Sequence, residues 1–259
     1  MKPMKKFTGV LKNNTSIYIY GIFFAFIVWY IISISQGYGN LIFPGPIETV
    51  KKLGEILGSK TIYISILWTM LRTLIGFISA FILALILGIS IGSFKKTQVF
   101  FKPLITILKS APTAAFVFLF LILSGSRYAP IYIVFILSFP ILYEAMVGGL
   151  NNIDKEVIDA VKLDGGDNLT IFFNVKLPLS IPYLFVGVLS SFALSLKTAI
   201  MAEIIAGDTN YGLGSMITAY RNLEPANLTP IFSITLVAII IIIVIDLVAS
   251  RLLKLKKDY

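Results

Sequence analysis

Six long apolar runs dominate the sequence. An α-helix needs about 20 apolar residues to cross the roughly 30 Å hydrocarbon core of a bilayer. The runs cover residues 17–35, 62–92, 104–123, 131–147, 181–205 and 231–250. Charged residues make up only 14% of the chain, whereas soluble domains carry about a quarter. The sequence therefore predicts an all-α, polytopic membrane protein with six transmembrane helices.

The first and third of these runs carry extra information. Residues 17–35 follow a lysine-containing segment, as the core of a signal peptide would, but the run is too long for that role and no small-x-small site ends it cleanly, so we expect a retained helix. The third run contains Lys109 and Pro112. Proline removes a backbone donor and clashes with the preceding turn, so this helix is expected to bend or break. The chain shows no repeat, linker or low-complexity segment, which favours a single domain over residues 1–259.

Lysine and arginine are distributed unevenly between the two sets of predicted loops. Cytoplasmic loops of membrane proteins carry an excess of both residues. One set holds fourteen of them and the other only five: Lys2, Lys5, Lys6, Lys12, Lys95, Lys96, Lys102, Lys155, Lys162, Lys176, Arg251, Lys254, Lys256 and Lys257, against Lys51, Lys52, Lys60, Arg127 and Arg221. The sequence therefore predicts a multi-pass membrane protein with both termini in the cytoplasm. Because the net charge of +9 lies in such flanks, nucleic-acid binding is not expected.

A short amphipathic helix is predicted on the outer surface after the first run. Pro46 suits the first turn of a helix. Apolar residues then recur at helical spacing: Ile47, Val50, Leu53, Ile56 and Leu57.

A polar stretch separates the fourth and fifth runs, on the predicted cytoplasmic side. Its apolar residues recur at helical spacing from residue 153 to 164, and Asp154 is placed to cap this helix. Gly165 and Gly166 follow, and glycine accepts the left-handed conformation in which helices commonly end. Asp167 can cap a second helix that runs to Pro178, where the chain turns back toward the membrane.

Patterning alone leaves two roles open for this loop. It fits an amphipathic hairpin that covers the helix bundle, and it fits a docking surface for another protein. Acidic residues outnumber basic ones here, whereas lipid headgroups attract basic helices, so an apolar face with acidic flanks suits a protein partner better. The acidic residues are Asp154, Glu156, Asp159, Asp164 and Asp167, and the basic ones are Lys155 and Lys162.

The same loop resembles the "EAA" loop of the permease subunits of bacterial ATP-binding-cassette (ABC) importers. That pattern is Glu-Ala-Ala, three residues, Gly, nine residues, Ile or Val, one residue, Leu-Pro. The matching residues here keep every spacing, with Asp for Glu and Val for the second Ala: Asp159, Ala160, Val161, Gly165, Val175, Leu177 and Pro178. The loop extends over about residues 148–180.

Further segments resemble the branch of these permeases that serves nitrate, taurine and sulfonate importers. "LIFPGPIETVKKL" is similar to the segment after that branch's first helix, and "LRTLIGFISAFILALILGISIG" to its second helix. "LKSAPTAAFVFLF" is similar to its third helix, with Lys109 in place of arginine and Pro112 kept. "MAEIIAGDTNYGLGSMI" is similar to its Ala-Glu-Met and Gly-Leu-Gly segments, through Glu203 and residues 212–214.

The resemblance implies a type I importer permease fold in the cell (cytoplasmic or inner) membrane that acts as a homodimer. Two copies of a separate ATPase subunit would bind and hydrolyse the ATP, and an external solute-binding protein would deliver the solute. A coupling helix at residues 153–164 would dock on the ATPase through the loop residues Val157, Asp159, Ala160, Val161, Gly165, Leu177 and Pro178. The permease itself would need no catalytic residue, cofactor or metal, and the sequence has no Gly-x4-Gly-Lys-Ser/Thr phosphate loop. The solute is expected to be a small polar or anionic molecule such as a sulfonate, nitrate or a vitamin precursor.

Several charged residues fall within or near the apolar runs. Such residues usually face the bundle interior and form pairs. They could line a positively charged pathway, for which the candidates are Arg72, Lys109, Pro112, Lys197 and Glu203. Alternatively the charges are structural, with Arg72 and Lys197 neutralising Glu203 or Glu144, and Asp246 paired with Arg251. For each of these residues taken by itself, we favour the structural role. Lys109 is the best pathway candidate, because it lies beside the Pro112 break and the backbone groups freed there need protein or a water-filled cavity.

Two other function classes are open to test. An ion-gradient-driven secondary carrier could use Glu144, Glu203 and Asp246 to carry protons or sodium. An enzyme is not expected, because the chain has no histidine and no cysteine and offers no paired-acid motif.

Overall fold

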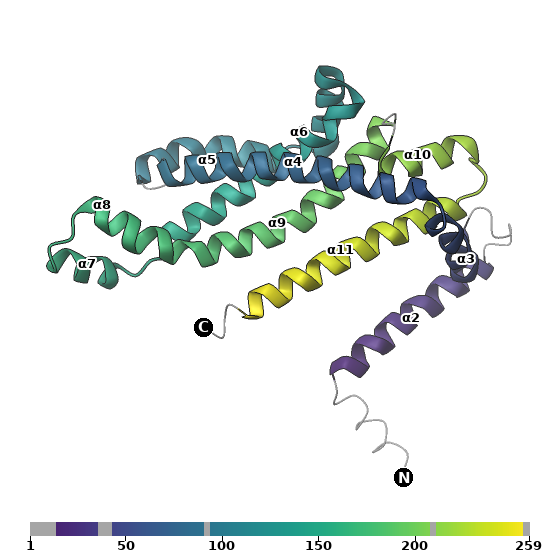
Figure 1. Ribbon diagram of the computed structural model, residues 1–259, viewed down its shortest axis with the longest axis horizontal. Coiled ribbons are helices and arrows are strands. Elements are labelled where there is room, and N and C mark those ends of the chain that lie inside the picture. Colours follow the sequence, from purple (N-terminus) through teal and green to yellow (C-terminus); the bar gives the residue numbers. More distant parts are fainter. Residues whose placement is uncertain (1–13, 36–42, 91–93, 208–210, 256–259) are drawn as a thin grey trace, which may run out of the picture. The chain divides into compact units, whose positions relative to one another are not determined.

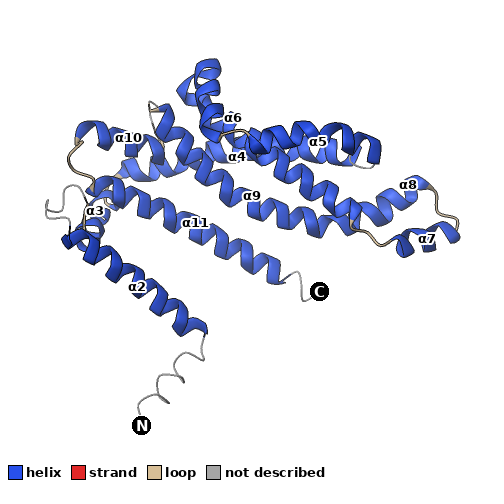
Figure 2. Ribbon diagram, turned by 180° about the vertical axis from the view of Figure 1, so that it is seen from behind, coloured by secondary structure: helices blue, strands red, loops and turns tan. Residues whose placement is uncertain are grey.

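The computed structural model describes residues 14–35, 43–90, 94–207 and 211–255, and within these ranges all regular structure is helical (Figures 1 and 2). The all-α prediction is therefore confirmed. Several residues used in the sequence argument lie outside the described ranges: Lys2, Lys5, Lys6, Lys12, Lys256 and Lys257, together with residues 41–42, 91–93 and 208–210. Contacts divide the chain into two units, residues 1–59 with 219–237 and residues 60–218 with 238–259. The single-domain assignment stays a prediction.

The first unit contains α2 (Asn14–Ser35), α3 (Pro46–Leu57) and the beginning of α11 (Thr229–Leu255). Trp29 Nε1 donates to the carbonyl of Pro44 at 3.0 Å, and this holds the end of α2 against the entry to α3. Ser233 Oγ donates to the carbonyl of Thr49 at 2.9 Å. The predicted amphipathic helix at residues 46–57 is confirmed as α3, which begins at Pro46.

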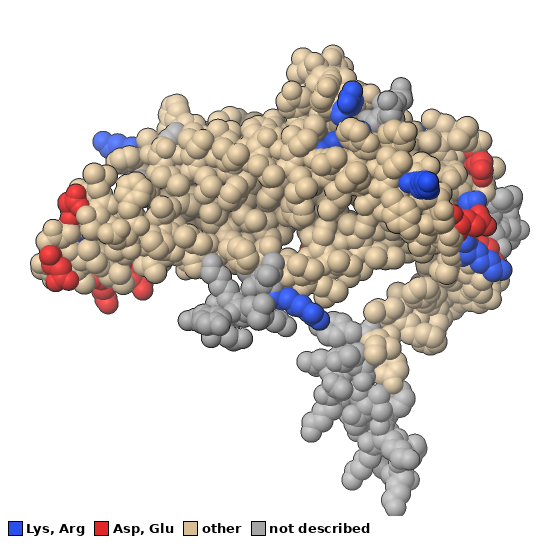
Figure 3. All heavy atoms as spheres, in the orientation of Figure 1, with Lys and Arg blue, Asp and Glu red and all other residues tan. Residues whose placement is uncertain are grey.

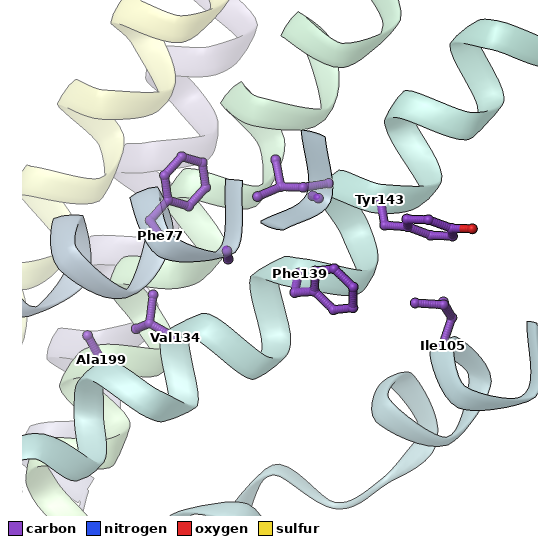
Figure 4. Packing of buried hydrophobic residues seen from close by; sticks show 9 residues of the cluster. Phe77, Ile105, Val134, Phe139, Tyr143 and Ala199 are labelled. Carbon is purple, nitrogen blue, oxygen red and sulfur yellow. The ribbon is translucent and has the colours of Figure 1, made fainter. Parts of the chain in front are cut away.

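The second unit holds most of the long helices. These are α4 (Lys60–Ser90), α5 (Lys95–Ser110), α6 (Thr113–Asn151), α7 (Lys155–Leu163), α8 (Asn168–Ile171), the π-helix η2 (Phe172–Lys176), α9 (Leu177–Ala206) and most of α10 (Leu213–Leu223). Helices α4, α6 and α9 pack together around a core with a small contribution from α5. Figure 4 shows residues of this core, among them Phe77, Val134, Phe139 and Ala199.

Small residues allow α4 to approach α6 closely. Gly76, Ala80, Ala84 and Gly88 recur every fourth residue on α4, and all four are buried. A Cβ atom at Gly76 would lie 2.5 Å from the carbonyl oxygen of Ile131 on α6. Close helix packing through small residues is common in membranes, and this stripe lets α4 pack directly against α6.

Within the described residues, four helices are long and apolar enough to span a membrane: Lys60–Ser90, Thr113–Asn151, Asn168–Ala206 and Thr229–Arg251. Together with α2, they match five of the six apolar runs. The third run is divided as expected: α5 ends at Ser110, and α6 begins after Pro112. The second half of the third run and the whole fourth run both lie in α6. Gly125, with a φ of 75°, kinks α6 between these two segments.

Candidate functional site

Helix α7 lies at the surface along its whole length. It spans Lys155–Leu163, within the predicted residues 153–164, and none of its residues is buried. The side chain of Val157 is 40% exposed and that of Leu163 is 88% exposed. Asp154 occupies the N-cap position as predicted, although its side chain makes no cap hydrogen bond. Of the apolar residues of α7, Val157, Ala160 and Leu163 are therefore exposed, and Ile158 and Val161 are half-buried.

A glycine turn ends α7 as the sequence predicts. Gly165 has a φ of 87°, a conformation that strains any residue with a Cβ atom. The Gly166 amide donates to the carbonyl of Val161 at 2.9 Å, and a Cβ atom at Gly166 would lie 2.8 Å from that oxygen. Both glycines are therefore needed for this turn.

Asp167 caps the helix that follows, also as predicted. Its carboxylate accepts a hydrogen bond from the Thr170 amide at 2.9 Å. Hydrogen bonding to the Thr170 side chain and, next, to its amide lowers the pKa of Asp167 below its ordinary value. The loop is thus fixed on both sides of the glycine turn by local interactions.

The prediction that the second helix ends at Pro178 is wrong. Helix α8 passes through η2 into α9, so that Asn168–Ala206 forms one helix of 39 residues. In η2 the Leu177 amide bonds to the carbonyl of Phe172, five residues earlier. Such a wider turn accommodates an insertion in the backbone ladder, and Pro178 lies at the start of α9, where its missing N–H is tolerated. Leu177 is half-buried and Pro178 is exposed within this continuous helix.

Acidic side chains gather over α7 and the turn that follows it (Figure 3). All five acidic residues of the loop are exposed, and Asp159 has a loose contact of 3.7 Å with Lys162. Beside them lies a groove of about 470 Å³, lined by residues of the end of α4, α7, α8 and η2, including Ile89, Ile158 and Phe172. The loop therefore presents both apolar and acidic surface.

Glu203 forms a buried network that joins α4, α9 and the start of α10. Its carboxylate is fully buried and accepts from Arg72 Nη1 at 2.7 Å. Thr69 Oγ1 lies 2.8 Å from the same carboxylate, and the Gly214 amide donates to it at 3.0 Å. Arg72 also donates to the carbonyl of Tyr211. The geometry matches the structural role expected for the Arg72–Glu203 pair, because neither charge is open to a solute.

Lys109 and Lys197 are brought to one hollow between α5, α6 and α9. Its volume is about 380 Å³, and it is lined by both lysines together with Thr113, Thr198 and apolar residues. Lys109 Nζ lies 2.6 Å from Glu144 Oε2, and both side chains are about half-exposed. Among the described residues, Lys197 has no ion-pair partner. The expected neutralisation by Lys197 is thus not observed; Glu144 pairs with Lys109 instead.

Two further sequence expectations have definite outcomes. Pro112 separates α5 from α6 beside the hollow that contains Lys109. Asp246 and Arg251 are both described and exposed, yet they form no ion pair with each other. They lie five residues apart on α11, and side chains at that spacing do not share a face as those three or four apart do.

Sequence reasoning missed two polar residues that the structure makes prominent. Thr69 precedes Arg72 by three residues, so helical spacing alone places it on the same face. Tyr143 is 5% exposed and its hydroxyl has no hydrogen-bond partner in the described residues. No sequence signal marks Tyr143, because it sits in an apolar run with other aromatic residues.

Known proteins resemble this chain over most of its length. It is 28% identical over 221 residues to the riboflavin transport system permease protein RibX of Chloroflexus aurantiacus, covering 85% of this chain and 80% of that protein. It is 24% identical over 197 residues to the nitrate import permease protein NrtB of Synechocystis, covering 72% and 70%. An inward-facing structure of the MetNI methionine ABC transporter has the same fold, with a TM-score of 0.61 and 16% identity over 72% of this chain and 92% of that chain.

A sequence profile gives the family directly. The profile of the binding-protein-dependent transport system inner membrane component matches residues 80–256, which include α7, the glycine turn and the hollow that holds Lys109 and Lys197. Since this match covers more than half of the chain, the protein belongs to the inner-membrane permease components of binding-protein-dependent ABC transport systems.

Proposed function

We propose that the chain forms the translocation pathway of an ATP-driven importer and that α7 is the surface through which a separate ATPase subunit moves it. The exposure of α7 along its whole length carries this proposal. Val157 and Ala160 would contact the ATPase, while Gly165 fixes the direction in which α7 leaves the membrane helices. The family is one of transport permeases and not of enzymes, so ATP hydrolysis is assigned to the partner.

The proposed assembly is a dimer of two copies of this chain, with two ATPase subunits and an external solute-binding protein. Both termini would face the cytoplasm, on the side of α7 and of the lysine-rich loops. The seam of α5, α6 and α9 would line the pathway, with Lys197 and Lys109 giving it positive charge. Arg72 and Glu203 would hold its wall together and not touch the solute. This lining suits a small polar or anionic solute, such as a sulfonate, nitrate or a vitamin precursor.

An ion-gradient-driven carrier is not favoured. Glu203 is buried in an ion pair and Glu144 is paired with Lys109. Family membership also favours an ATP-driven system. Uptake by the purified permease in an ion gradient, with no ATPase present, would contradict the proposal.

Gly165→Ile tests the coupling assignment. A β-branched residue strains a φ of 87°, so the direction of α7 should change while the membrane helices stay folded. We expect unchanged insertion, loss of ATPase copurification, and ATP-dependent uptake lowered at least tenfold. Gly54→Ile is the matched control, because Gly54 lies in helix α3 and a Cβ atom added there would have no atom within 4 Å. Unchanged copurification and uptake in Gly165→Ile would show that this turn does not position a coupling helix.

Val157→Asp tests the contact itself without altering the backbone. The side chain is 40% exposed on α7, so the substitution costs little in the isolated chain but places a charge in the proposed interface. We expect weaker ATPase binding. Val50→Asp, at a side chain 52% exposed on α3, should leave ATPase binding unchanged.

A further inference from the structure

The groove beside α7 has a lining unlike the rest of the loop, and we call it the α7 groove. It lies at the end of the helix bundle where α4 ends and α5 begins (Figures 1 and 2). Its volume of about 470 Å³ is within the range of small-molecule sites. None of the functions considered above uses this groove.

Two helices that form the groove are long enough to span a membrane. Helix α4 has 31 residues and the helix Asn168–Ala206 has 39, whereas about 20 residues cross the hydrocarbon core. The groove is formed by the last residues of α4 and the first residues of Asn168–Ala206. Because both helices are longer than the core requires, these ends extend into the layer of the lipid headgroups.

One wall of the groove consists of exposed apolar side chains. Phe94 is 64% exposed, Leu169 is 67% exposed and Phe173 is 56% exposed, and all three line the groove. Phe172 packs edge-on against Phe173, with their ring centres 5.2 Å apart. Large apolar side chains gathered in one exposed groove are unusual on a surface that faces water, and they match a hydrocarbon chain.

The charged side chains of the groove are both positive. Lys162 and Lys176 line it, whereas no described carboxylate does. The half-buried Lys176 has no ion-pair partner among the described residues. Lys162 lies 3.7 Å from Asp159, but both side chains are more than half exposed, and such surface pairs are weak. Both ammonium groups are therefore available to an anion, and Asn168 beside them can donate as well.

The groove and the acidic surface of the loop belong to different sides of α7. Ile158 and Lys162 are four residues apart, share one side of the helix and line the groove. Val157 and Ala160 do not line it, and neither do the five acidic residues of the loop. A ligand in the groove therefore leaves uncovered the surface that we assign to the ATPase.

We propose that the α7 groove binds an anionic phospholipid from the membrane leaflet on its side. The phosphate lies between Lys162 and Lys176, and an acyl chain lies along Phe94 and Phe173. The apolar wall favours a lipid over a free phosphate ion. The lipid fills the space between α7 and the end of α4, so the membrane helps to hold α7 in place. This site goes beyond the proposed transport function and does not depend on which protein binds α7.

Lipid binding to the purified, full-length permease tests the site. Native mass spectrometry counts the lipids retained when phosphatidylglycerol or phosphatidylcholine with the same acyl chains is added. One lysine near an anionic headgroup contributes about fivefold in affinity, so we expect two to favour phosphatidylglycerol by about 25-fold. Lys162→Gln/Lys176→Gln should remove most of this preference. Lys96→Gln/Lys102→Gln removes the same charge at exposed residues of α5 outside the groove and should retain the preference.

A second pair of variants tests the apolar wall. Phe173→Ser should weaken phosphatidylglycerol binding about tenfold, because it removes apolar surface that the acyl chain covers. Phe100→Ser is the matched control. Phe100 is 77% exposed and packs edge-on against Phe101 at 5.3 Å, but it does not line the groove. Glycerol phosphate, which carries the headgroup charge without acyl chains, should compete only weakly with the lipid.

Several results would overturn the proposal. Equal binding of the two lipids, or equal losses in the groove and control variants, would mean a general attraction to a basic surface. Competition by glycerol phosphate as strong as that by lipid would make the groove a site for a small anion. Release of the lipid on addition of the ATPase subunit would place the groove inside the ATPase interface. Lipid binding is measured without ATP, so its failure is distinct from a failure of ATPase coupling, which Gly165→Ile reports.

Discussion

Replacing Glu203 by glutamine should destabilise the protein strongly, because it leaves the Arg72 cation buried without its counter-charge. Arg72 is 5% exposed, and its remaining partners are the Tyr211 carbonyl and the face of Trp68, whose ring centre is 5.5 Å away. Removing one partner of a buried ion pair costs about 3–5 kcal/mol. Glutamine keeps an oxygen that can accept from Thr69 and the Gly214 amide, so we expect a cost near the lower end, about 3 kcal/mol.

The assay is thermal inactivation of the detergent-purified permease, followed as the fraction that stays monodisperse on size-exclusion chromatography. For a chain of this size, each kcal/mol shifts the midpoint by roughly 2–4 °C, so Glu203→Gln should lower it by roughly 6–12 °C. The matched control is Glu144→Gln. That glutamate also pairs with a cation, but its side chain is 48% exposed, and exposed pairs contribute about 1 kcal/mol or less.

A double-mutant cycle completes the test. Glu203→Gln leaves the charge of Arg72 unpaired, and Arg72→Gln removes that charge. The loss of stability in the double variant should therefore be smaller than the sum of the losses in the two single variants. Additive losses, or equal losses for Glu203→Gln and Glu144→Gln, would refute the view that the buried pair anchors α4 to α9.

Two further predictions concern backbone packing and the loop. Gly76→Ala should lower thermal stability by about 1–3 kcal/mol through overpacking, whereas Gly21→Ala, with no atom within 4 Å of its Cβ position, should be neutral or stabilising in the same assay. Asp167 has a lowered pKa in the folded loop, so its stabilisation is fully present above the unfolded pKa of about 3.9 and is lost as pH falls through the folded value. Amide exchange at Thr170, corrected for intrinsic rate, should therefore speed up at low pH. Asp167→Asn keeps the cap but should abolish this pH dependence of the Thr170 exchange rate. If the pH dependence persists in Asp167→Asn, another titrating group causes it.

Features set by local chemistry could be predicted from the sequence. The turn at Gly165, the cap at Asp167 and the helix start at Pro46 each depend on neighbours within a few residues, and all three are observed. The break at Pro112 belongs to the same class, since the clash of proline with the preceding turn is local.

Features set by distant contacts could not be predicted in the same way. Arg72 and Glu203 are separated by 131 residues, and several acidic residues near the apolar runs were equally plausible partners. The partner of Lys109 is likewise set by tertiary packing, because α5 packs on α6 and this brings Glu144 to Lys109. At Pro178 the local sequence is ambiguous, because proline is tolerated both after the end of a helix and in the first turn of one. In the structure η2 joins α8 to α9, so Pro178 lies in the first turn of α9.

The continuity of Asn168–Ala206 also has a mechanical consequence. A helix of 39 residues is about 58 Å long at 1.5 Å per residue, roughly twice the thickness of the hydrocarbon core. Its two irregular features, η2 and the internal Pro182, lie toward one end. Tilting the helix by about 5° at η2 would carry Glu203, some 39 Å away by the same rise per residue, through about 3 Å. A small tilt at η2 would thereby become a shift of atomic-diameter size at the far end of the same helix.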